Sequence, residues 1–419
     1  MITTIDLSPG ISLHCCRDTR FKQGCLSFQI VRPMNRDENA MNALLPSILL
    51  RGTKQHPDLR SITQQLDELY GAAVSTIVRR VGDYQTTGMS CSFISDNFTL
   101  EGDQILAPMV DFLRQLFTQP VLENGVFRAD YVEGEKKNLI ATILAQKNDK
   151  RAYCSSQMLK KMCARDSYGI PRLGEAEAVA AITPESLFAH YQKVLAESAV
   201  QICYVGQEAA ELPTLLTELF RGVNRCYVNL PAQTHFVSAG GGDFVEEMDI
   251  AQGKLCMGFS SDIDLRQGDL AAMQVCNVIF GGGMTSKLFM IVREKMSLCY
   301  DIGSAFHGSK GILTVSAGID CDKVAVVRQQ ISAQLEAVCN GDITDEELFA
   351  AKQALISGLR GTHDAPGSIE GYYSSSALSG LRWTPDEYIA AIEKVDKAAV
   401  SAVAKTLRLD TVYFLKGVQ

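Results

Sequence analysis

Arg293 and Tyr300, seven residues apart, are two residues whose side chains have groups that could bind a substrate. A permanently charged guanidinium and a phenolic hydroxyl can hold a carbonyl or carboxylate group, and they can stabilise negative charge as a carbonyl is attacked. The same spacing fits a purely structural arrangement, in which Arg293 pairs with Glu294 or another nearby carboxylate and Tyr300 packs in a sheet. The spacing alone leaves both interpretations open.

A run of three glycines, Gly281, Gly282 and Gly283, precedes this pair. The backbone N–H groups of a glycine-rich loop before a helix can bind phosphate. The sequence lacks the phosphate-loop pattern, however, because Lys287 falls in the wrong frame, and no predicted strand leads into the loop as a dinucleotide-binding fold requires. The glycines therefore predict the end of a helix followed by a tight turn.

The pattern of cysteines and histidines gives little support for a metal site. The 13 cysteines are scattered, mostly in apolar segments, and none forms a C-x-x-C pair, which excludes zinc-ribbon and thioredoxin sites. His14, Cys15 and Cys16 are the one His/Cys cluster, but adjacent residues on a strand point to opposite faces. The 6 histidines show no helical i, i+3 or i, i+4 pairing. We therefore expect no metal to bind through these residues.

The composition is that of a globular protein large enough for two or three domains, with 46% hydrophobic and 21% charged residues. A net charge of -8 without a basic cluster argues against nucleic acid as a partner. No apolar run reaches the roughly 18 residues that a membrane span needs. The first residues show neither the basic nor the apolar region of a signal peptide. We expect a cytoplasmic protein without a membrane span.

The elements that would position these residues occur twice along the chain. In the first half, helical periodicity or strand alternation predicts two helices, a strand, a helix and a long charged helix, over 37–53, 58–71, 83–95, 98–120 and 122–149. The second half repeats that order over 265–283, 285–300, 309–320, 322–341 and 344–362. Chance similarity between two α+β halves is the alternative explanation.

A Pro-, Gly- and Ser-rich stretch, residues 228–244, is predicted to be a linker between the halves. The domain boundaries are then 1–227 and 245–419. Strands and helices cluster rather than alternate strictly, so each half is expected to be an α+β domain. Its sheet would be mostly antiparallel or mixed, with helices packed on one face.

The second half carries a motif that resembles the insulinase/pitrilysin family of zinc peptidases, in the short form in which two chains pair. The family pattern is a glycine run with Ser-x-Leu-Phe, then Arg-Glu-Lys, Leu-x-Tyr and a glycine-led strand. Here it is carried by Gly281 to Gly283, Ser286, Leu288, Phe289, Arg293, Glu294, Lys295, Leu298, Tyr300 and Gly311. Ser297 stands where glycine is usual. A second family-like stretch runs from Ala164 to Val194, and the resemblance extends over nearly the whole chain.

The resemblance also identifies what is missing. Active members carry His-x-x-Glu-His on the helix before a Lys/Arg-Gly-Thr turn, with a glutamate on a later helix as the third zinc ligand. Proline inside that helix, residues 42–53, is itself unusual because it removes a backbone hydrogen bond at a cost of about 3 kcal/mol. The positions of the catalytic residues are occupied here by Ala43, Pro46, Ser47 and Thr142. None can bind zinc or act as a base.

The family's substrate-binding Asn-Ala pair on an edge strand corresponds to Ser75-Thr76, an alignment that is one residue off in its spacing to Tyr84. The chain is therefore expected to bind no cofactor and to hydrolyse no peptide alone. Arg293 and Tyr300 match the family's Arg and Tyr, which project into the metal site of the partner chain, and Gly281 to Gly283 match a loop near the chamber opening.

The resemblance thus implies a catalytically inactive subunit of a heterodimeric zinc peptidase. The partner would be a homologous chain with His-x-x-Glu-His and zinc, and the substrate a peptide. The alternative is a non-catalytic homodimer that binds peptides or serves as a scaffold.

Overall fold

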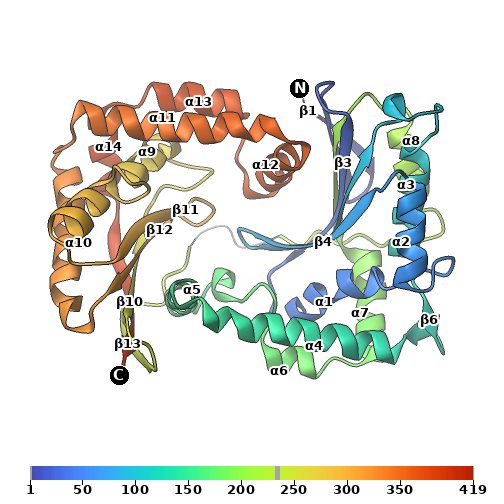
Figure 1. Cartoon of the computed structure of the whole chain (residues 1–419), viewed down its shortest axis with the longest axis horizontal. Helices are drawn as coiled ribbons and strands as arrows, with labels where there is room; N and C mark the ends of the chain where they lie inside the picture. The colour runs from blue at the N-terminus through green and yellow to red at the C-terminus, as the bar shows by residue number, and fades with distance from the viewer. Residues whose placement is uncertain (1, 232–235, 419) are drawn as a thin grey trace. The chain divides into compact units, whose positions relative to one another are not determined.

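The computed structural model describes residues 2–231 and 236–418, which group by contacts into two compact units (Figure 1). Unit 1 comprises the described residues of Met1–Leu144, Ile170–Gln233 and His363–Leu378, and unit 2 those of Ala145–Gly169, Thr234–Thr362 and Ser379–Gln419. The division thus differs from contiguous domains at 1–227 and 245–419, because one segment of each half groups with the unit built mainly from the other half.

Unit 1 is built on a mixed six-stranded sheet with the strand order β1-β2-β8-β3-β5-β4. Neighbouring strands are antiparallel except for the parallel pair β2 and β8. In sheet order the strands are β1 Ile2–Ser8, β2 Ile11–Arg17, β8 Ala199–Gly206, β3 Gln23–Pro33, β5 Tyr84–Ile94 and β4 Ala73–Val81. Strand β4 is therefore an edge strand.

Side chains alternate along the strands of unit 1 and give its sheet two different faces. On β3, Leu26, Phe28 and Ile30 join the apolar core, in which the Phe28 and Phe117 rings lie 4.0 Å apart. Ser27 and Gln29 occupy the opposite face and are buried there as well. The helices of this unit are α1 Asn39–Leu49, α2 Leu59–Glu68, α3 Leu106–Thr118, α4 Ala129–Ala145, α6 Ala176–Ala180, α7 Pro184–Glu197 and α8 Leu212–Leu219, with a small hairpin of β6 Leu122–Glu123 and β7 Val126–Phe127.

The sheet of unit 2 has five strands in the order β11-β12-β10-β13-β9, and here only β13 and β9 are parallel. Its strands are β11 Asp301–His307, β12 Ile312–Ile319, β10 Gly253–Ser260, β13 Arg408–Gly417 and β9 Gly242–Met248. The five strands from β9 to β11 can be matched one by one to the strands from β2 to β4 in the sheet of unit 1. The matched strands follow one another along the chain in the same order, and neighbouring strands are parallel or antiparallel in the same places. The predicted duplication and the α+β fold class are therefore confirmed, and unit 1 adds β1 at one edge.

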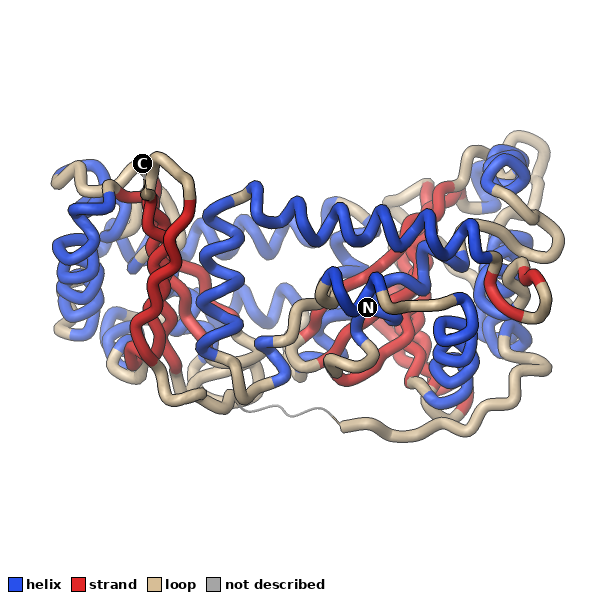
Figure 2. Tube along the Cα trace, turned by 90° about the horizontal axis from the view of Figure 1, so that it is seen from below, coloured by secondary structure: helices blue, strands red, loops and turns tan. Residues whose placement is uncertain are grey.

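The helices of unit 2 follow the predicted order, with one change of type. They are α9 Leu270–Phe280, α10 Val324–Cys339, α11 Asp345–Gly361, α13 Pro385–Glu393 and α14 Lys397–Ala404. The helix predicted over 285–300 is a π-helix, Leu288–Lys295. Its turn is wider than that of an α-helix: the Met296 N–H donates to the carbonyl of Ile291, five residues earlier. Such wider helices are rare and are frequently found at functional sites. Figure 2 shows the strands of each unit gathered together with helices alongside.

Each sheet also carries a helix on its second face, and these two helices are exchanged between the halves of the chain. Helix α5, Lys150–Met162, belongs to the first half but packs in unit 2, where Cys154, Met158 and Met162 contact the sheet. Helix α12, Pro366–Ser379, belongs to the second half, and its Ile369 packs on the sheet of unit 1. The sequence analysis predicted the helix-covered face but not this exchange.

The predicted linker, 228–244, falls partly on residues 232–235, which lie outside the described residues. Its last three residues belong to β9, which begins at Gly242. Among the helices described, none has both the length and the apolar character needed to cross a membrane.

Candidate functional site

The positions of the family's zinc motif lie on α1, which keeps Pro46 inside the helix as predicted. Ala43 and Pro46 are buried in unit 1 and Ser47 is partly buried. A side-chain contact also holds the helix in place: the Asn42 side-chain amide donates to the Gln85 side-chain carbonyl oxygen over 3.0 Å. It is thus a packed structural element of unit 1.

The fourth position, Thr142, is exposed on α4, and its hydroxyl donates to the Asn138 carbonyl over 2.9 Å. One turn earlier than Asn138, Glu135 pairs with Arg51 at 3.3 Å, and the Arg51 guanidinium lies 4.7 Å from the centre of the Tyr131 ring. In the part of the chain that the structure describes, no group of three or more His, Cys, Asp or Glu residues is arranged to hold a metal ion. The side chains at the family's ligand positions do not fit zinc.

Ser75 and Thr76 lie where the resemblance places them, on the edge strand β4. Both are exposed, and Ser75 is the register partner of Ser90 on β5. The outer edge of β4 pairs with no described strand, so its backbone groups are available to an additional strand.

Arg293, Tyr300 and the three glycines, Gly281 to Gly283, line a single pocket of about 590 Å³ in unit 2. The pocket runs along the edge strand β11 and is bordered by the π-helix and by α5. The predicted site residues of the second half are therefore brought together, although their role in binding stays a prediction.

Arg293 lies near the end of the π-helix with its side chain 37% exposed. Its guanidinium stacks 4.5 Å from the centre of the Phe289 ring and pairs with Glu294 at 3.5 Å. The ion pair with Glu294 that the structural interpretation of Arg293 predicted is therefore present, but the distance is long and the Glu294 carboxylate is exposed. The stacking on Phe289 orients the guanidinium while leaving N–H donors free for another group.

Tyr300 precedes β11 and is 58% exposed, so it does not pack in the sheet. Its backbone N–H donates to the Gly318 carbonyl, and its hydroxyl donates to Asp320 over 2.9 Å. This hydrogen bond raises the pKa of the phenol and keeps it protonated. The turn before it places Ser297 at φ +52°, a backbone region that favours glycine, which gives a physical reason for the glycine usual there.

The triple glycine ends α9, as predicted. Gly281 is the C-cap residue of α9, and its carbonyl accepts from the Ser304 backbone N–H over 2.8 Å. A Cβ atom at Gly281 would lie 2.8 Å from the Leu288 side chain. The first glycine is therefore required by close packing, whereas nothing lies within 4 Å of a Cβ at Gly283.

Sequence reasoning missed several residues of this pocket. Arg151 comes from α5, donates to the Ser316 hydroxyl over 3.0 Å and pairs with Asp301 at 3.4 Å. No pattern in the sequence connects Arg151 to a pocket built from the second half. Phe289, by contrast, was named as part of the family motif, and its spacing of four residues before Arg293 is consistent with the contact between the two side chains.

Comparisons with known proteins identify chains of similar sequence and fold. Residues 181–355 match the model of the "Peptidase M16 inactive domain". The chain is similar to a Bacillus subtilis protein named "Probable inactive metalloprotease YmfF", with 29% identity covering 98% of this chain and 96% of that one.

Two solved structures also match. A conserved protein from Enterococcus faecalis has 30% identity and a TM-score of 0.93, covering 99% of this chain and 98% of the other. A peptidase M16 inactive domain from Pseudomonas fluorescens has 18% identity and a TM-score of 0.83, and the match covers 100% of this chain and 98% of the other. At this identity the match shows a shared fold alone.

Proposed function

Since the chain belongs to peptidase family M16, the insulinase/pitrilysin metallopeptidases, and is an inactive member of it, we propose that it is the non-catalytic subunit of a two-chain peptidase. Its partner would be a homologous chain that carries His-x-x-Glu-His and zinc. This chain would complete the chamber around a peptide and supply Arg293 and Tyr300 to the partner's active site. A cytoplasmic location stays a prediction.

The observation that carries this proposal is the contrast between the two units. In unit 1 the four zinc-site positions hold side chains that cannot bind metal or activate water, whereas in unit 2 Arg293, Tyr300 and the glycine loop share one pocket. A chain that had lost every role in proteolysis would have no reason to differ in this way between its halves.

The state of the two side chains suits binding to a peptide carbonyl. Arg293 keeps N–H donors beyond its contact with Glu294, and the Phe289 ring limits how far the guanidinium moves. The Tyr300 hydroxyl donates its one proton to Asp320 and can still accept a hydrogen bond, so donation to a substrate oxygen would require the hydroxyl to turn away from Asp320. Such donors, when placed against the oxygen of a carbonyl under attack, stabilise the negative charge that develops there.

The test is affinity purification of the tagged chain from its own cells, followed by mass spectrometry and a peptidase assay on the complex. A co-purifying chain with His-x-x-Glu-His, active only in the complex, is the expected result. Arg293→Ala should then lower kcat about a hundredfold. Arg328→Ala is the matched control, because Arg328 is 35% exposed and pairs with Asp243 at 2.7 Å outside the pocket. Unchanged activity in Arg293→Ala and Tyr300→Phe would refute the role of the pair.

The alternative function is a homodimeric peptide-binding scaffold. The free edges of β4 and β11, each in its own unit, would support it by strand addition. Purification of the chain only with copies of itself, together with peptide binding and no cleavage, would favour this alternative over the silent-subunit proposal.

A further inference from the structure

A second pocket, of about 700 Å³, lies in unit 1 and has no part in the proposed function. It lies over β1, β2 and β8, on the polar face of the sheet, and is bordered by Ala377 and Leu378 at the end of α12. The apolar side chain of Val31 on β3 also lines it. The pocket thus combines a polar sheet surface with an apolar wall.

The charges around this pocket have one sign. Asp6 is the one Asp or Glu that lines it, and no Lys or Arg does, among the described residues. His14 adds no charge near neutral pH, because burial lowers its pKa. Asp6 is exposed and forms no ion pair with any described residue. An entering cation would therefore be attracted by Asp6, whereas an anion would be repelled by it.

A buried acceptor without a donor points in the same direction. Gln201 is 3% exposed, and its side-chain N–H donates to the Ser374 carbonyl over 3.1 Å. Its side-chain carbonyl oxygen, Oε1, has no hydrogen-bond partner among the described residues. A buried acceptor left unpaired costs about 1–3 kcal/mol. A ligand donor that reaches Oε1 as the Gln201 side chain turns toward the pocket would remove that cost.

Strand register places the two acceptors in one row. Asp6 pairs with Ser12, and Ser12 pairs with Gln201. Two strand spacings separate the outer members by roughly 10 Å between Cα atoms. All three residues line the pocket, so the acceptors stand on either side of Ser12.

We propose that this pocket binds a primary amine carried on an aliphatic chain. The ammonium is held by the Asp6 carboxylate with the Gln201 carbonyl as a further acceptor, and the alkyl chain lies against Val31 and Leu378. A free alkylamine and a lysine side chain of a peptide share this chemistry, and the two sources are distinguished by experiment.

The test is isothermal titration calorimetry, which measures the dissociation constant of the full chain for n-hexylamine. A second titration uses a short peptide that is blocked at both ends and contains one lysine. Hexanoate, hexanol and the same peptide with acetyllysine are the matched ligand controls. Binding of hexylamine, of the lysine peptide or of both supports the proposal and identifies the source. Binding of neither, or equal binding of hexanol, overturns it.

Two variants locate the site. Asp6→Asn should weaken amine binding about fivefold, which corresponds to the upper range for an exposed ion pair. Asp37→Asn is the control, since it makes the same change at an exposed carboxylate elsewhere in unit 1. Gln201→Met, which removes the acceptor at similar volume, should also weaken binding while leaving binding of hexanol unchanged. Equal weakening by Asp6→Asn and Asp37→Asn would refute the assignment.

Discussion

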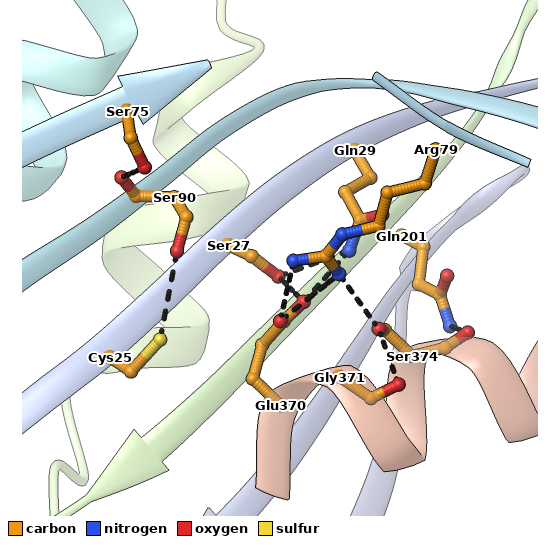
Figure 3. A network of polar contacts seen from close by, with 10 residues as sticks. All are labelled: Cys25, Ser27, Gln29, Ser75, Arg79, Ser90, Gln201, Glu370, Gly371 and Ser374. Carbon is orange, nitrogen blue, oxygen red and sulfur yellow. Dashed lines mark hydrogen bonds and ion pairs between the residues drawn. The ribbon is translucent and has the colours of Figure 1, made fainter. Parts of the chain in front are cut away.

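Glu370 is a buried carboxylate whose removal should loosen α12 from the sheet of unit 1. It is 1% exposed and accepts from the Ser27 hydroxyl over 2.7 Å and from the Gln29 amide over 2.9 Å. The Arg79 guanidinium on β4 pairs with it at 3.1 Å (Figure 3). One side chain of α12 thus binds two strands of the sheet, and Glu370→Ala leaves three donors without their acceptor.

The expected loss follows from the burial of the two partners. Removing one member of a fully buried ion pair costs about 3–5 kcal/mol, because the remaining charge is left unpaired. The Arg79 side chain is 36% exposed, so water compensates part of this loss, and we expect about 2–3 kcal/mol. The double variant Arg79→Met, Glu370→Leu should lose less than Glu370→Ala, because it leaves no unpaired charge.

Native-state hydrogen exchange is the suitable assay, because a chain with two units need not unfold in one step. The loss should be confined to peptides from β3, β4 and α12. Asp262→Ala is the control: it breaks a pair with Arg408 whose side chains are 66% and 67% exposed, and it should change stability by about 0.5 kcal/mol at most. A loss below about 1 kcal/mol for Glu370→Ala would refute the reasoning.

Three further predictions concern backbone strain, pH and zinc. Ser297→Gly should stabilise unit 2 by about 0.5–1 kcal/mol in urea unfolding, because φ is +52° there, whereas Ser375→Gly inside α12 should destabilise. Burial lowers the pKa of His190 to about 4 from 6.5, so the unfolded chain binds the extra proton. The free energy of unfolding should therefore fall from pH about 6.5 toward 4, and less in His190→Gln. The chain should retain no stoichiometric zinc by elemental analysis, and binding should return when the family's residues are restored by Ala43→His, Pro46→Glu, Ser47→His and Thr142→Glu.

Local sequence patterns predicted five elements in each half, only one of them a strand, because periodicity and end signals are local properties; the other strands of the two sheets were not predicted. Thr344 illustrates this: its hydroxyl accepts from the Glu347 N–H over 3.1 Å and begins α11 as expected. Likewise Gly281 ends α9. The π-helix was beyond such reasoning, since its apolar spacing over a short segment is compatible with an ordinary helix, and its wider turn is set by the surrounding packing.

Contacts between distant parts of the chain account for what the sequence did not reveal. Glu135 lies on the predicted charged helix over 122–149, and no local pattern there indicates its ion pair with Arg51. Tyr300 was matched to the family motif, yet its partner Asp320 lies 20 residues later. Nothing in a charged residue's own neighbourhood specifies its partner, because ion pairs depend on which surfaces the fold brings together.

The exchange of α5 and α12 affects both the pocket of unit 2 and the polar face of the sheet in unit 1. Arg151 reaches the pocket of unit 2 from the first half of the chain, and Glu370 reaches the sheet of unit 1 from the second half. A chain cut between the predicted domains would separate Glu370 from Ser27, Gln29 and Arg79, and these donors would lose their shared acceptor. The duplication therefore explains why the two sheets share one topology, whereas the exchanged helices make each polar sheet face depend on residues from the other half of the sequence.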